Sequence, residues 1–169
     1  RGLQHPDRIG HTATEIGVAV GIEQALTTEL FVDRVLIGDC RVELGILGHL
    51  RDVVLDVTDR ERVTVSLDEL PEEWQAVDIL INNAGLARGF SRFHEIDLDD
   101  MEEMMDTNVK GLIYVSCKII PGMVARGGGH IVNIASLAGL IHMPKMDSYN
   151  VTKAGVIALT KSMACEWAR

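Results

Sequence analysis

The alternation of short apolar runs with longer helical segments is the feature that most constrains how this chain folds. Each run is nearly continuous in β-branched and aliphatic residues and ends at Asp, Asn, Gly or Ser. The four runs are RVLIG (34–38), DVVLDV (52–57), VDILI (77–81) and HIVNIAS (130–136). Strands whose two faces are both covered by helices have this composition, because neither face meets water. The alternation therefore predicts an α/β fold with a doubly wound parallel sheet.

Helical segments lie between the runs and after the last one. These segments are residues 17–30, 58–70, 98–126 and 147 to the end. Thr58 is the predicted N-cap of the second segment and Asp97 that of the third. We expect the third helix to stop at Gly127, or to kink or end earlier at Pro121.

Composition and charge bound the class of protein. The chain has 169 residues, 47% of them hydrophobic, which suits one domain with a core over residues 1–169. Its net charge of −9 argues against nucleic-acid or anionic-membrane partners, which need a basic surface. No apolar run approaches the roughly 18–20 residues of a membrane span. Three scattered cysteines suit free thiols in a cytoplasmic protein, and the six histidines show no metal-binding spacing.

Polar residues stand where the predicted strands end. Asp39 follows the first run, Asp56 lies in the second, NNAG (82–85) follows the third and Ser136 ends the fourth. In doubly wound sheets, ligands bind beyond the carboxyl ends of the strands. Each of these residue types also suits an ordinary turn, so singly they leave a structural role equally open.

A tyrosine and a lysine stand four residues apart in SYNVTKAG (148–155). At that spacing, Tyr149 and Lys153 share one face of a helix. An ammonium group favours the ionised form of a neighbouring phenol, which prepares the phenol for proton transfer. Taken alone, the pair is also typical of a solvated helix face.

Four motifs together point to a known family. In chain order they are NNAG, Asn108 in DTNVKG, Ser136 in GHIVNIAS, and YNVTK, with Ser136 13 residues before Tyr149. In this order and spacing, residues 34–169 resemble the short-chain dehydrogenase/reductase family, and LDVTD (55–59) resembles its adenine-side turn. The resemblance implies a Rossmann-like fold and an NAD(P)-dependent oxidoreductase that interconverts a secondary alcohol and a ketone.

The resemblance also implies roles for individual residues. Tyr149 would be the general acid/base, and Ser136 would hydrogen-bond the substrate oxygen. Lys153 would contact the nicotinamide ribose and tune Tyr149. Asn108 would hold a water between Lys153 and solvent, which requires a local break in its helix. The residues expected around the cofactor are Gly17, Asp39, Asp56, Val57, Asn82, Ala84, Gly85, Tyr149 and Lys153.

The expected cofactor is NAD, with NADP as the alternative. A carboxylate at Asp39 would hydrogen-bond a ribose 2′-hydroxyl and repel a 2′-phosphate. Arg41, two residues further on, would instead favour the phosphate of NADP.

The two ends of the chain depart from the family. The family's glycine-rich turn aligns with GHTATEIG (10–17), where Gly17 remains and Glu15 brings a negative charge towards a diphosphate. Residues 4–9 are too polar for a buried first strand, whose place is between the runs 34–38 and 77–81. The chain ends 16 residues after Lys153. We therefore expect a sheet that is incomplete at its first strand and lacks the carboxyl-terminal strands.

These departures leave a second hypothesis open beside the enzyme. The chain is then a catalytically inactive fragment or relative that serves as a binding or oligomerisation module. Under either hypothesis the family's habit predicts a homodimer or homotetramer that forms through the two long helices.

Overall fold

A computed structural model of the chain describes residues 35–38, 41–46 and 49–167. They belong to one compact unit, Val32–Arg169. Gly17, Asp39 and the predicted helix 17–30 lie outside the described residues, so one domain over residues 1–169 stays a prediction.

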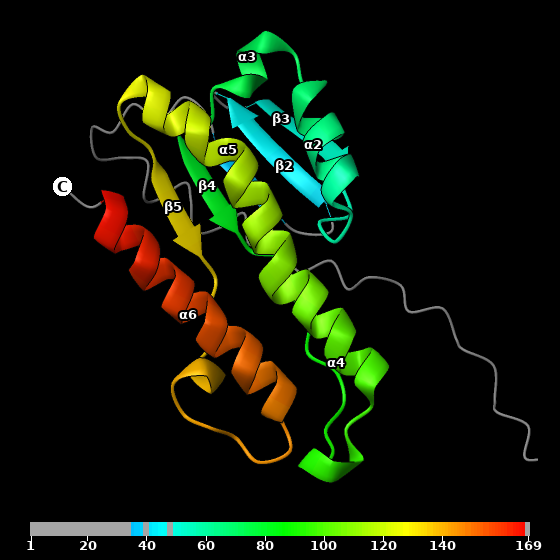
Figure 1. Ribbon diagram of the computed structural model, residues 1–169. Helices are drawn as coiled ribbons and strands as arrows, with labels where there is room; N and C mark the ends of the chain where they lie inside the picture. Colours follow the sequence, from blue (N-terminus) through cyan, green and yellow to red (C-terminus); the bar gives the residue numbers. More distant parts are fainter. Residues whose placement is uncertain (1–34, 39–40, 47–48, 168–169) are drawn as a thin grey trace, which may run out of the picture. The chain divides into compact units, whose positions relative to one another are not determined.

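The described strands form one five-stranded sheet (Figure 1). They are β1 (Val35–Gly38), β2 (Arg41–Ile46), β3 (His49–Val54), β4 (Ile79–Asn82) and β5 (His130–Asn133). Their order across the sheet is β3-β2-β1-β4-β5. The pairs β1–β4 and β4–β5 are parallel, with Leu80 opposite both Leu36 and Ile131. This half of the sheet, with its covering helices, confirms the α/β class.

The other half of the sheet corrects two predictions. β2 pairs antiparallel with both β1 and β3, so the run 52–57 is not a parallel strand, and the strand there is His49–Val54. Only two residues separate β1 from β2 and β2 from β3, and so short a connection can join only antiparallel neighbours. β1 also pairs directly with β4, so no described strand occupies the place expected for a first strand.

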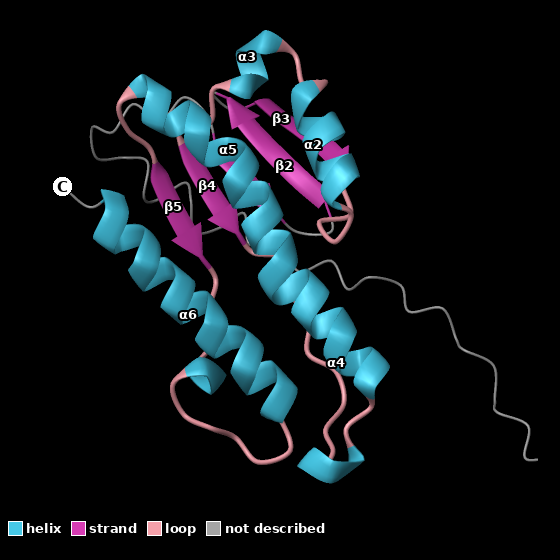
Figure 2. Cartoon of the chain, in the orientation of Figure 1, coloured by secondary structure: helices cyan, strands magenta, loops and turns pink. Residues whose placement is uncertain are grey.

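The helices follow the predicted segments closely (Figure 2). They are α2 (Arg60–Asp68), α3 (Glu72–Gln75), α4 (Leu98–Met105), the π-helix η3 (Asp106–Gly111), α5 (Leu112–Arg126) and α6 (Asp147–Trp167). Two short 3₁₀ turns, η2 (Phe93–Glu95) and η4 (Leu137–Gly139), lie in the loops. No helix among the described residues is long and apolar enough to cross a membrane.

The helix caps were predicted in part. Asp97 caps α4, and Gly127 ends α5 in the left-handed conformation, as expected. α2 is capped by Asp59, not Thr58, because the Thr58 hydroxyl donates to the Asp56 carboxylate at 2.7 Å. Pro121 lies inside α5 without ending it; it is exposed, so water can reach the backbone where the helical hydrogen bond is lost.

The core lies between α2, α5 and β4. Its buried side chains are Leu55, Val57, Val63, Leu67, Leu70, Val77, Leu80, Val115, Ile119 and Met123. Two ties across this core hold α5 in place: Lys118 pairs with Asp68, and the Arg126 guanidinium donates to the Val77 carbonyl. α5 is the continuation of the segment that carries Asn108, so the core positions that residue.

Candidate active site

Lys153 joins α6 to the carboxyl end of β5. Its Nζ donates to the carbonyl oxygen of Ile134 at 2.9 Å, just beyond the end of the strand. Gly139 packs against the same turn of α6: a Cβ there would lie 2.7 Å from the Lys153 carbonyl carbon and oxygen. The end of β5 and the first turns of α6 therefore lie together.

Tyr149 and Ser136 belong to the two segments that meet at this junction. The Lys153 Nζ is 5.9 Å from the centroid of the Tyr149 ring, within the range of a cation–π contact. Ser136 lies two residues beyond Ile134, and its Oγ accepts a hydrogen bond from the Ala138 N–H at 3.2 Å. Both side chains are half-buried, so each keeps a surface that a ligand can reach.

Burial sets the electrostatics of Lys153. The side chain is 5% exposed, and desolvation lowers the pKa of Lys153 below its ordinary value of 10.5. The Ile134 carbonyl is the one protein acceptor within hydrogen-bond distance of Nζ among the described residues. Of the ammonium's three donors, two therefore remain for a ligand.

Asn108 lies in the π-helical segment η3, so the helix does break locally there, as expected. Its side chain is 1% exposed. The Oδ1 accepts from the Leu86 N–H at 2.8 Å, and Nδ2 donates to the Leu86 carbonyl at 2.9 Å and to Thr152 Oγ1 at 3.0 Å. Asn108 therefore ties the loop after β4 to α6. Its predicted role as the holder of a water stays a prediction.

Gly85 lies where these elements meet. A Cβ on this exposed residue would be 3.2 Å from both Asn108 Oδ1 and Lys153 Nζ. The missing side chain leaves space beside the buried Lys153 ammonium and lets a ligand approach the loop backbone closely. This cradle fits a sugar hydroxyl beside Lys153, as the ribose of a nicotinamide nucleotide requires.

The Asn82 side chain is directed into the protein. It is buried, and Nδ2 donates to Ser116 Oγ at 3.0 Å and to Asn133 Oδ1 at 2.8 Å. Asn133 Nδ2 in turn donates to Thr160 Oγ1 of α6 at 2.9 Å. This series of hydrogen bonds links α5, β4, β5 and α6. Asn82 therefore supports the site by holding these four elements together.

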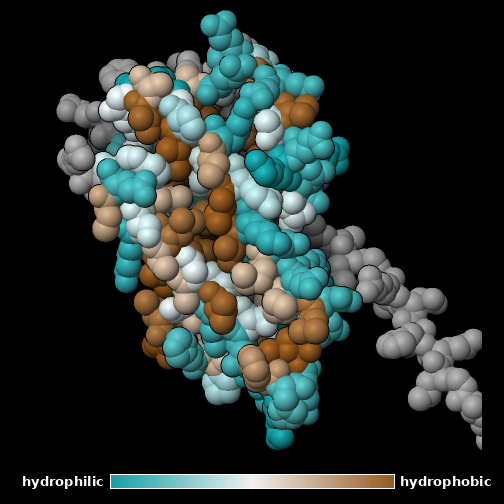
Figure 3. All heavy atoms as spheres, viewed as in Figure 1, coloured by the Kyte–Doolittle hydropathy of each residue, from teal (hydrophilic) through white to brown (hydrophobic). Residues whose placement is uncertain are grey.

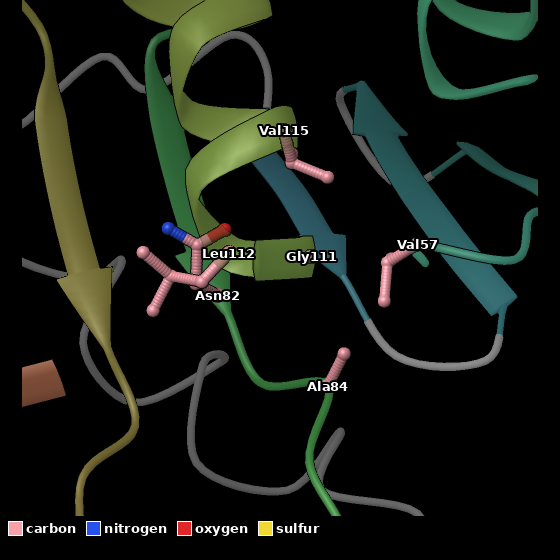
Figure 4. Close-up of a pocket in the computed structure, with 6 residues that line it drawn as sticks. All are labelled: Val57, Asn82, Ala84, Gly111, Leu112 and Val115. Atoms are coloured by element: carbon pink, nitrogen blue, oxygen red, sulfur yellow. The ribbon is translucent and has the colours of Figure 1, made fainter. Parts of the chain in front are cut away.

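The predicted adenine side is a shallow depression (Figure 4). It is lined by Val57, Asn82, Ala84, Gly111, Leu112 and Val115. Its volume is about 10 Å³, enough for one water-sized group and too small to enclose an adenine ring. Asp56 does not line it, and its carboxylate accepts from the Thr58 N–H and hydroxyl. The described residues thus leave space for a cofactor group beside Gly85 and Lys153, whereas Val57 and Ala84 offer only a surface against which it can pack.

Sequence reasoning missed three buried residues of the site. Thr152 links Asn108 to α6 and donates to the Tyr149 carbonyl at 2.9 Å, and Ser116 binds Asn82. Gly111 allows Val57 to pack closely, since a Cβ there would be 2.6 Å from Val57 Cγ2. Thr152 and Gly111 stand inside the motifs YNVTK and DTNVKG, whose small residues are the signal that was available.

The fold and the junction of β5 with α6 define a dehydrogenase-type α/β protein, and the comparisons name its family. The family described as short chain dehydrogenase matches residues 41–169. The chain therefore belongs to the short-chain dehydrogenase family.

Several characterised proteins are similar to this chain. The NADP-dependent 3-hydroxy acid dehydrogenase YdfG of Escherichia coli K12 is 47% identical over 114 residues, which are 68% of this chain and 45% of YdfG. A probable NADP-dependent dehydrogenase of Haemophilus influenzae is 40% identical over 116 residues, 69% of this chain and 46% of that protein. This chain thus spans about half the length of these relatives.

Solved structures support the same fold. The crystal structure of serine dehydrogenase from Escherichia coli matches with a TM-score of 0.65 and 43% identity, over 66% of this chain and 52% of that one. A closed form of serine dehydrogenase complexed with NADP⁺ matches with the same TM-score and identity. Two of these relatives are named as NADP-dependent and serine dehydrogenase is complexed with NADP⁺, whereas a xylitol dehydrogenase structure with 34% identity and a TM-score of 0.65 is NAD⁺-bound.

Proposed function

We propose that this chain carries the catalytic residues of a nicotinamide-dependent oxidoreductase that interconverts a small secondary alcohol and a ketone. One observation supports this most strongly: the hydrogen bond from Lys153 Nζ to the Ile134 carbonyl. It draws the helix that bears Tyr149 to the strand end that precedes Ser136. A hydroxyl, a phenol and an ammonium group around one strand end suit proton transfer coupled to hydride transfer.

Each side chain has a distinct part in the proposed reaction. Ser136 Oγ hydrogen-bonds the substrate oxygen and holds it near Tyr149. In the oxidation direction, the Tyr149 phenolate takes the proton from the substrate hydroxyl, and in reduction the phenol returns it. Lys153 favours the phenolate by its charge and holds a ribose hydroxyl of the cofactor. The nicotinamide supplies hydride acceptance and donation when bound.

We propose that Asn108 acts on this site by positioning. Its three hydrogen bonds join Leu86 and Thr152, so the loop that carries Gly85 keeps a constant distance from α6. Within the cofactor site, Gly85, Tyr149 and Lys153 serve the nicotinamide ribose, whereas Val57 and Ala84 form a wall on the adenine side. The assignment of Gly17, Asp39 and Asp56 to the cofactor stays a proposal based on the family resemblance.

We propose NADP as the better cofactor, because two relatives at 40% and 47% identity are named as NADP-dependent, whereas the similar structure named for NAD⁺ is 34% identical. NAD remains the alternative, based on the position of Asp39. The named substrates of YdfG and of serine dehydrogenase are a hydroxy acid and an amino acid that bears a hydroxyl group. Small hydroxy acids are accordingly the first substrates to test.

Replacement of Tyr149 tests the proposed function. With NADP⁺ and a panel of hydroxy acids and secondary alcohols, Tyr149→Phe should lower kcat/KM by about 10²–10⁴-fold, because it removes the general acid/base and little else. Tyr114→Phe is the matched control, since Tyr114 is the other tyrosine of the chain, lies in α5 and packs against the hydrophobic core. Equal rates in the wild type and Tyr149→Phe would reject the proposal.

Apolar residues exposed at the surface favour the module hypothesis. Val132 and Ile134 are 44% and 41% exposed at β5, which is the edge of the described sheet. Figure 3 also shows apolar residues at the surface between α5 and α6. We propose a homodimer or homotetramer on these grounds, and light scattering tests the oligomeric state.

A fluorescence titration separates the enzyme hypothesis from the module hypothesis: saturable binding of NADPH supports the enzyme, and its absence supports the module.

A further inference from the structure

The segment that joins Ser136 to Tyr149 contains an unusual turn at Met143–Met146. The Met146 N–H donates to the Met143 carbonyl at 3.3 Å, with Pro144 and Lys145 at the two central positions. Lys145 has φ = 65° and is the one non-glycine residue with positive φ among the described residues. Glycine is the residue that adopts such a backbone conformation without strain. A lysine in this conformation carries backbone strain, which is concentrated at functional sites.

The buried side chain of Asn150 binds the backbone of this turn. Asn150 is 5% exposed, and its Nδ2 donates to the Met143 carbonyl at 2.9 Å. The Asn150 N–H donates to the Met146 carbonyl at 2.7 Å. Asn150 is the neighbour of Tyr149 in α6, so the same residue fixes the turn relative to the proposed acid/base. Four residues of chain limit the distance between the Lys145 and Tyr149 Cα atoms to about 14 Å.

The charge of Lys145 is available to a ligand. The side chain is exposed and makes no ion pair within the described part of the chain, unlike Arg88, Lys110 and Lys118. The nearest acidic residue in the chain is Asp147, two residues further on, and it makes no ion pair with Lys145 in the described structure. An unpaired cation in the segment that joins Ser136 to Tyr149 attracts a small anion.

We propose that Lys145 is a specificity-determining residue that selects alcohol or ketone substrates bearing a carboxylate group. The proposal rests on the proposed oxidoreductase function and adds the substrate class to it. The Lys145 ammonium binds the carboxylate, while Ser136 and Tyr149 hold the reacting oxygen. The constrained turn fixes the Lys145 backbone, so that little loop ordering is needed on binding.

Lys145→Gly tests this role without endangering the fold. Glycine relieves the positive φ, so the melting temperature should be unchanged or higher. For a 3-hydroxy acid, kcat/KM should fall about 10–100-fold, as expected for the loss of a charged hydrogen bond. For the methyl ester of the same acid, it should stay within about twofold, since no charge is there to be recognised. Lys145→Arg should retain the preference for the acid, and Lys161→Ala, an exposed lysine further along α6, should resemble the wild type.

Two outcomes overturn the proposal while the wild type is active. One is an equal loss for the acid and the ester in Lys145→Gly. The other is a loss of preference in His142→Ala with none in Lys145→Gly, which would move the role to His142. If the wild type turns over neither substrate, the proposed function fails, and calorimetric binding of the acid decides on Lys145 separately. Binding that disappears in Lys145→Gly then supports its role, whereas equal binding, or none in the wild type, rejects it.

Discussion

The candidate site has a polar end around Tyr149 and an apolar end around Val57. At the Tyr149 end, polar side chains hydrogen-bond to other elements beside the proposed reactive groups. At the Val57 end, apolar groups pack closely against one another. Asn108, Thr152 and Lys153 each hydrogen-bond to another element, and Gly85 leaves space beside the buried Lys153 ammonium. Around Val57, the close approach of Gly111 leaves about 10 Å³. Both ends lie beyond the carboxyl ends of strands, since Val57 follows β3 and Ile134, which Lys153 binds, follows β5.

The difference teaches where the chemistry of this chain is concentrated. A buried polar network keeps its geometry only when every member is satisfied, and it then fixes the groups beside it within narrow limits. The apolar end supplies packing and a surface against which a flat ring can lie. We therefore expect substitutions at the Tyr149 end to change both stability and function, and those at the Val57 end to act mainly through packing.

The largest expected effect follows from removal of the Asn108 side chain. Asn108→Ala leaves the Leu86 backbone groups and the Thr152 hydroxyl without their partner, which should lower the free energy of unfolding by about 2–4 kcal/mol. Urea denaturation measures this loss. Asn83→Ala is the matched control, because this half-buried amide makes no side-chain hydrogen bond in the described structure. A similar loss in both variants would mean that the hydrogen bonds of Asn108 contribute no more to the free energy of unfolding than an amide without such bonds.

The packing at the Val57 end gives the next effect. Gly111→Ala brings a Cβ to 2.6 Å from Val57 Cγ2, which should destabilise the protein by about 1–3 kcal/mol. Adding Val57→Ala removes the shortest of the contacts and leaves those to the residue 57 Cβ and carbonyl oxygen at 3.0 and 3.2 Å, so the two losses should sum to more than the loss of the double variant. Strict additivity in thermal unfolding would show that the two residues do not touch.

Gly85 separates function from stability. A Cβ on Gly85→Ala enters the space beside Asn108 Oδ1 and Lys153 Nζ, so the affinity for NADPH should fall about tenfold, or about 1.4 kcal/mol. Unfolding should change by less than about 1 kcal/mol, because the residue is exposed. Gly128→Ala is a suitable control, since nothing lies within 4 Å of its added Cβ. Undiminished binding by Gly85→Ala would remove this residue from the cofactor site.

The smallest effect concerns pH. Burial lowers the pKa of Lys153 from its ordinary value of 10.5, so the unfolded chain binds the proton more tightly than the folded one. The free energy of unfolding should therefore rise as the pH increases from the pKa of Lys153 in the folded protein up to 10.5. Below that pH window, the destabilising effect of the buried charge is fully present. Lys153→Met should lack this rise when urea midpoints are compared across alkaline pH. Parallel pH profiles for the two proteins would contradict the lowered pKa.

The features that depend on near neighbours in the chain were predictable. The spacing of Tyr149 and Lys153 predicted one helix face, and the sequences around Asp97 and Gly127 predicted a start and a stop. Where local signals competed, prediction was weaker: Thr58 and Asp59 are both good N-caps, and the carboxylate of Asp56 decided between them by binding Thr58. The antiparallel pairing of β2 was missed because apolar runs do not specify strand direction.

The sequence by itself determined which residues lie on the same helix face and which family the chain resembles, since both are carried by short spacings and ordered motifs. Only the tertiary structure decided that Asn82 binds Asn133, 51 residues away, and that Asn108 binds Thr152, 44 residues away. The physical reason is that periodicity tells which side of an element faces inward, whereas a hydrogen-bond partner is chosen by how distant elements pack. The candidate site is formed by such distant pairs.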